Sequence, residues 1–62
     1  MYTRCFERET TDRFGQTVYE VVNISPYGFE WYVDNELRRT GLVEFLDGDV
    51  LLLLAEGFNE VL

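Results

Sequence analysis

Apolar and polar residues alternate along much of the first 40 positions of the chain, as they do in strands that bury one face of a sheet. The alternation is clearest in the segment 16–24, which places Val18, Val22 and Ile24 on one face and more polar residues on the other. Several residues of this segment are β-branched, which favours a pleated strand. We therefore predict a strand at 16–24 and another at 2–9, joined by a polar loop that ends in glycine.

A second pair of strands is predicted around a tight turn at Asp34 and Asn35. The segment Ser25–Gly28 has proline and glycine in the order that a reverse turn requires, so the chain should reverse before a strand at 29–33. Asp34 and Asn35 tolerate the positive φ angles of a two-residue hairpin. The returning strand is then predicted at 36–40.

Counting from this turn places Trp31 opposite Arg38 and Glu30 opposite Arg39, which would give a cation–π pair and an ion pair. The same register leaves the apolar ends of the outgoing strand opposite polar residues, which is a poor match. An alternative prediction makes residues 34–46 a helix that is capped by the aspartate at its start. The apolar residues of such a helix would spread around most of its surface, and a glycine inside it would cost about 1 kcal/mol relative to alanine. We therefore favour the hairpin.

The last third of the chain predicts a further hairpin, because Asp47 and Gly48 separate two apolar segments at 42–46 and 49–54. The second segment does not alternate, which indicates that both of its faces are covered. The cover would be the tail at 56–62, the sheet itself if it curls into a barrel, or a second copy of the chain. We favour a barrel, a dimer or both.

The predicted fold is therefore mainly β. A single domain over residues 1–62 would form a small antiparallel sheet of about five short strands, curled or half-barrel in shape. The alternative is an α+β fold, in which a three- or four-stranded sheet carries one helix near 34–46. A chain this short, with one cysteine and no histidine, has no internal disulfide and lacks the usual zinc ligands. We therefore expect a second copy to add buried area, as in a homodimer.

The chain carries twelve acidic residues against five arginines, with no lysine and no histidine, and its formal net charge is −7. Residues 40–62 contain five carboxylates and no base. Such a surface repels nucleic-acid phosphates and anionic lipids, and it attracts basic protein surfaces. We therefore expect a larger basic protein as the partner, without direct contact to nucleic acid or membrane. The longest apolar run, at 50–55, is far shorter than the roughly 20 residues that cross a bilayer.

The residue types on which most enzymes depend are scarce in this chain. Histidine and lysine are absent, and Arg4 would not activate the neighbouring thiol of Cys5, because adjacent strand residues point to opposite faces. The segment Asp47–Asp49 offers fewer oxygens than calcium takes, and a turn explains it. We therefore expect no enzyme, no metal and no cofactor, and the single thiol favours a cytoplasmic location.

The sequence thus predicts a non-enzymatic acidic module that presents carboxylates to a basic surface on a larger protein and acts as an inhibitor. The carboxylates assigned to this contact are Glu7, Glu9, Glu44, Asp47, Asp49 and Glu56. In size and acidity the chain resembles the small phage-encoded inhibitors that imitate DNA, which implies a partner whose basic surface binds nucleic acid. The alternative is a structural or assembly subunit that self-associates through an apolar sheet face. The residues assigned to that contact are Trp31, Phe45, Leu51 and Leu53.

Overall fold

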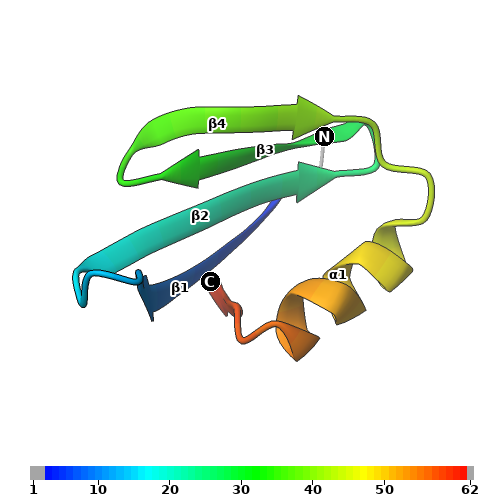
Figure 1. Ribbon diagram of the computed structural model, residues 1–62. Coiled ribbons are helices and arrows are strands. Elements are labelled where there is room, and N and C mark those ends of the chain that lie inside the picture. Colours follow the sequence, from blue (N-terminus) through cyan, green and yellow to red (C-terminus); the bar gives the residue numbers. More distant parts are fainter. Residues whose placement is uncertain (1–2, 62) are drawn as a thin grey trace.

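The computed structural model describes residues 3–61, which form one open antiparallel sheet of five strands and a single helix (Figure 1). The elements in chain order are β1 (Arg4–Thr11), β2 (Thr17–Ser25), β3 (Gly28–Val33), β4 (Glu36–Gly41), α1 (Leu46–Ala55) and β5 (Asn59–Val61). Across the sheet the strands follow the order β4-β3-β2-β1-β5. The prediction of a mainly β fold with five antiparallel strands is confirmed.

The first four strands lie close to their predicted positions. β2 pairs with β1 and with β3 along most of its length, as expected of the most regular segment of the sequence. Asp34 and Asn35 have φ angles of 50° and 68°, so they form the predicted two-residue turn between β3 and β4. The predicted start of the first strand at Tyr2 lies outside the described residues.

The register between β3 and β4 differs from simple counting. A bulge at the level of Trp31 shifts the pairing by one residue, so Trp31 lies opposite Arg39 and Glu30 lies opposite Thr40. The predicted pairs with Arg38 and Arg39 are therefore wrong. The shift places Gly41 opposite Phe29, whose ring is so close that a Cβ on Gly41 would lie 2.5 Å from its Cε1 atom. The shifted register thus places a glycine where the ring of Phe29 leaves no space for a Cβ.

The predicted hairpin at 42–54 is wrong, because residues 46–55 form the helix α1. Leucine and alanine, which make up six of the ten residues of the helix, are strong helix formers, and Val50 is its only β-branched residue. Asp47 and Asp49 lie in the first turn, where negative charge is favoured by the helix dipole. The alternative prediction of a sheet with one helix is confirmed in that a single helix is present among the described residues, but its position at 34–46 is wrong, since most of that range is β4 and the connection that follows it.

The fifth strand comes from the tail and not from the leucine run. β5 pairs with β1, so that Asn59 lies opposite Glu7 and Val61 opposite Cys5. The tail therefore extends the sheet at one edge, whereas the sequence analysis considered it only as one of three possible covers of the apolar run. Its last residue, Leu62, is outside the described part of the chain.

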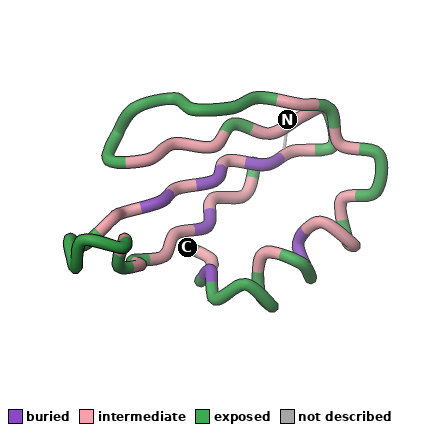
Figure 2. Tube along the Cα trace, viewed as in Figure 1, coloured by how far each residue is buried: buried purple, intermediate pink, exposed green. Residues whose placement is uncertain are grey.

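The core lies between one face of the sheet and the inner side of α1 (Figure 2). Its buried side chains are Phe6 from β1, Val22 and Ile24 from β2, Val50 from α1 and Phe58 from the segment before β5. Leu46 and Leu53 of α1 pack against this cluster and are partly buried. Among residues 3–61, no helix has the length and apolar character to cross a membrane.

Candidate functional site

A groove of about 570 Å³ lies between α1 and the sheet, and the strands β1, β2, β3 and β4 all contribute residues to its lining. The side chains that line its apolar surface are Val22, Ile24, Phe29, Trp31, Leu42, Leu52, Leu53 and Phe58. Its volume is within the range of typical ligand pockets, about 300–1,000 Å³. The groove is therefore a candidate binding site.

The groove exists because one helix cannot cover the whole sheet. Five strands spaced by about 4.8 Å make a sheet about 19 Å wide, whereas a helix with its side chains is about 10 Å across. α1 supplies Val50 to a core that otherwise comes from β1, β2 and the segment before β5. The apolar side chains of β3, Phe29 and Trp31, therefore stay only partly buried.

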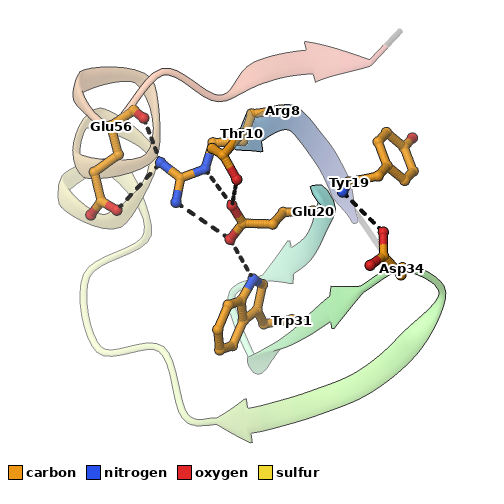
Figure 3. Close-up of polar contacts among 7 residues, drawn as sticks. All are labelled: Arg8, Thr10, Tyr19, Glu20, Trp31, Asp34 and Glu56. Carbon is orange, nitrogen blue, oxygen red and sulfur yellow. Dashed lines mark hydrogen bonds and ion pairs between the residues drawn. The ribbon is translucent and has the colours of Figure 1, made fainter. Parts of the chain in front are cut away.

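At one end of the groove lies the carboxylate of Glu20, a buried acid that is only 6% exposed (Figure 3). Arg8 donates to both of its oxygens, from Nε at 2.9 Å and from Nη2 at 3.3 Å. The indole Nε1 of Trp31 donates to Oε1 at 3.1 Å, and the hydroxyl of Thr10 donates to Oε2 at 3.2 Å. Three strands are thus joined through one carboxylate.

Arg8 extends this network to the end of the helix. Its Nη1 donates to the backbone oxygen of Glu56 at 2.6 Å and lies 4.0 Å from the Glu56 carboxylate. The guanidinium carbon also lies 4.3 Å from the ring centre of Phe58, which is a cation–π distance. One arginine therefore fixes the C-terminal end of α1 to β1 and β2.

The pKa of Glu20 reflects two opposing effects. Burial alone would raise this pKa, but the hydrogen bonds and charge of Arg8, with the donors on Trp31 and Thr10, outweigh burial and lower it. Glu20 is therefore ionised at neutral pH, and its charge is matched by Arg8. A carboxylate in this state holds the groove together and is poorly suited to exchange protons with a substrate.

The side of α1 that faces the groove has a simple pattern. Asp49, Leu52 and Glu56 are three or four residues apart, so they form one stripe along the helix, and all three line the groove. The opposite wall includes Arg39 of β4. Within residues 3–61, the side chains of Asp49 and Arg39 make no hydrogen bond or ion pair, so both charges are available to a partner.

Large apolar side chains are exposed on α1 and in the segment before it. The exposed ones in this region are Leu42, Phe45, Leu51, Leu52 and Leu54. Leu51 and Leu52 are 66% and 61% exposed, and Leu42 just before the helix is 86% exposed. Leu42 and Leu52 also line the groove, so the exposed apolar surface and the groove are continuous. A continuous apolar surface of this kind is typical of a protein interaction site.

The structure divides the six carboxylates that the sequence assigns to partner binding. Four of them, Glu44, Asp47, Asp49 and Glu56, lie in α1 or within two residues of its ends. Glu7 and Glu9 alternate with Arg8 along β1, so they point to the other face of the sheet. Glu7 accepts a hydrogen bond there from the hydroxyl of Tyr19. The acids thus form two separate groups.

The residues assigned to self-association are also divided. Leu51 and Phe45 are exposed near α1, whereas Leu53 packs against the core and Trp31 lines the groove. The thiol of Cys5 is partly buried, and burial together with the charge of Glu7 raises its pKa, which disfavours a reactive thiolate.

The sequence analysis missed Arg8 and Glu20. The signal was present in the alternation of β2, where Glu20 shares a face with Val18, Val22 and Ile24. A charged residue on a face that is otherwise apolar needs a partner when it is buried. Arg8 lies directly opposite in the β1–β2 pairing, which is how the sheet supplies that partner.

No group of three or more histidine, cysteine, aspartate or glutamate residues that could hold a metal ion occurs in the described part of the chain. We compared the chain with models of known protein families, with curated protein sequences and with solved structures, and none of these comparisons found a match.

Proposed function

We propose that this protein is a non-enzymatic binding module that contacts a basic surface of a larger protein through α1 and its flanking residues. The observation that carries the proposal is the exposure of leucines on a helix surrounded by acids. Leu51, Leu52 and Leu54 are exposed, while residues 40–62 contain five carboxylates and no base. Apolar contact would supply affinity, and the carboxylates would select a partner with lysine or arginine around its apolar surface.

One class of partner that fits is a protein whose basic surface otherwise binds nucleic acid. The module would act as an inhibitor of such a protein by covering that surface. A cytoplasmic location is part of the proposal, because the described cysteine is a single thiol without a disulfide. The contact uses the four acids near α1, while Glu7 and Glu9 lie on the opposite face of the sheet.

The test uses a minimal basic and apolar probe, an amphipathic peptide of leucine and lysine of about 14 residues, or four helical turns. A peptide with glutamate in place of lysine serves as the control probe. We expect calorimetry to show binding of the lysine peptide only, and we expect its affinity to fall at least tenfold between about 50 and 500 mM salt. Equal binding of both peptides, or an affinity indifferent to salt, would overturn the proposal.

Two double variants separate a local contact from net charge. Glu44→Gln with Asp47→Asn removes two charges beside α1, and Glu7→Gln with Glu9→Gln removes two charges from the other face of the sheet. We expect the first variant to weaken binding of the lysine peptide and the second to leave it within about twofold. Equal effects of the two variants would show that only the total charge matters.

Self-association is a second candidate function, favoured by the same exposed leucines. Two copies that meet through α1 would bring like charges together, so a homodimer of this kind should form more readily at high salt. Sedimentation as a function of salt distinguishes the two functions, because salt weakens binding of a basic partner and strengthens an acidic homodimer. Replacing Leu51 with serine should abolish such a dimer.

A further inference from the structure

We infer that the groove between α1 and β3 accepts an amphipathic helix of the partner, with the basic side of that helix along α1. This inference rests on the proposed function and identifies the part of the surface that the partner occupies. The docked helix would lie beside α1 and cover the half of the sheet that α1 leaves open (Figure 1). The two helices together would then form the second layer of the fold.

The argument for a helix comes from the hydrogen bonding of the groove walls. β3 pairs with β2 on one side and with β4 on the other, so its backbone groups are used within the sheet. The other wall is α1, whose backbone bonds are internal apart from its ends. β4 is an edge strand, and its unpaired backbone groups point outward in the plane of the sheet, so the groove over the sheet face offers side chains and no free backbone groups. A segment buried there must satisfy its own backbone groups, as a helix does.

The argument for apolar anchors comes from the lining of the groove. Phe29 and Trp31 of β3 line the sheet side, Leu52 lines the side of α1, and Leu42 of the connection between β4 and α1 completes the apolar lining. Helices that dock into such grooves insert apolar residues spaced by three or four positions. The polar groups of Glu20 and Arg8 are already paired with each other. An apolar side chain placed above them therefore leaves no charge unpaired.

The argument for the orientation comes from the two walls. Asp49 and Glu56 make the α1 wall anionic, and Arg39 makes the β4 wall cationic. A partner helix with lysine or arginine toward α1, and with neutral or acidic residues toward β4, matches both walls. A second copy of α1 does not match, because its acids would face Asp49 and Glu56 and it has no basic residue in its last turn.

Trp31 provides a direct readout, because it is the only tryptophan of the chain and lines the groove. We expect the leucine–lysine peptide, which contains no tryptophan, to shift the Trp31 emission to shorter wavelength and to reduce its quenching by acrylamide. A peptide of the same composition with two central prolines cannot form the helix and should bind at least about tenfold more weakly. Equal binding of the proline peptide would overturn the assignment of a helix.

Leu52 and Leu51 form a matched pair of test residues. They have similar exposure, but Leu52 lines the groove and Leu51 does not. We expect Leu52→Asn to weaken binding of the lysine peptide at least about fivefold, and we expect Leu51→Asn, which lies outside the groove, to weaken it clearly less. If the peptide binds while both variants weaken it equally and Trp31 stays unchanged, the groove is not the site, although the proposed function stands. If the peptide does not bind at all, the proposed function itself fails.

A second matched pair tests the orientation of charge. Asp49→Asn removes an anion from the α1 wall and should weaken binding of the lysine peptide. Arg39→Gln removes a cation from the β4 wall and should strengthen binding of the same peptide, because its lysines would otherwise meet a like charge. Effects of the same sign in the two variants would overturn the orientation. Circular dichroism of each variant confirms that the fold is retained.

Discussion

At the scale of single residues, the structure depends on how a buried carboxylate is balanced. Glu20 receives donors from Arg8, Thr10 and Trp31, and all buried side-chain polar atoms in the described residues have a partner. A fully satisfied network of this kind fixes the relative positions of its members, whereas removing one partner leaves another polar group unpaired. The network therefore holds Trp31 in a fixed position beside the groove.

Glu20→Gln should destabilise the fold by about 2 kcal/mol. The amide keeps one acceptor oxygen, but its NH₂ group would face the donors of Arg8 and leave them unpaired. Urea unfolding measures the change in the free energy of unfolding. Glu9→Gln is the control, since Glu9 is exposed on the same sheet and should change that free energy by less than about 0.5 kcal/mol. Equal effects of the two substitutions would show that the network adds nothing to stability.

The pH dependence of stability follows from the same carboxylate. The pKa of Glu20 is lower in the folded protein than the ordinary value of about 4.3, and the pKa of Glu60 is lowered by its hydrogen bonds from Arg4. The unfolded chain therefore binds more protons in acid. The stabilisation is complete above about pH 5 and is lost as the pH falls through the folded pKa values. We expect urea midpoints to fall between about pH 5 and pH 3, and to fall less steeply in Glu20→Gln. Parallel curves for the two proteins would contradict this account.

At the scale of elements, the strands were predictable from local rules. The alternation in β2 and the turn at Asp34 and Asn35 each act within a few residues, so they can be recognised without knowledge of the rest of the chain. The bulge at Trp31 was not predictable, because it accompanies contacts between side chains on neighbouring strands, such as the packing of Phe29 against Gly41. The groove was also not predictable from the sequence, since it depends on where α1 lies on the sheet.

The helix was predicted as a hairpin because Asp47 and Gly48 resemble a turn between two apolar strands. The opposing signals were the helix-forming leucines and Gly57, which ends the helix. Gly57 has a φ of 94°, its N–H donates to Leu54, and the N–H of Phe58 donates to Leu53. This is the Schellman arrangement, in which glycine follows the last helical turn. Glycine after a leucine run is therefore the signal that distinguishes this helix from a strand.

Gly57→Ala should lower the free energy of unfolding by about 1 kcal/mol or more. A Cβ at this position meets no atom within 4 Å, so the cost comes from the positive φ alone. Gly57→Asn is the matched comparison, because asparagine adopts this conformation more readily and should cost less than alanine. Thermal unfolding of the three proteins gives the ranking. If alanine were as well tolerated as asparagine, the helix end would not require a left-handed residue.

At the scale of the whole molecule, acidic charge works against the fold. The net charge of −7 is carried by 62 residues, and the carboxylates of residues 40–62 have no base among them. Repulsion between exposed acids is screened by salt over about 8 Å at physiological ionic strength. The largely buried pairs Arg4–Glu60 and Arg8–Glu20, at 2.5 and 2.9 Å, are screened much less. Salt should therefore remove more repulsion than attraction.

We accordingly expect the melting temperature to rise with sodium chloride. A gain of about 1 kcal/mol corresponds to about 4–8 °C for a domain of this size. The measurement is thermal unfolding between about 20 and 500 mM salt, at a protein concentration where sedimentation shows the monomer at both limits. A melting temperature that falls with salt would mean that ion pairs outweigh repulsion. In that case the acids near α1 would already be balanced within the molecule, and they would have little attraction left for a basic partner.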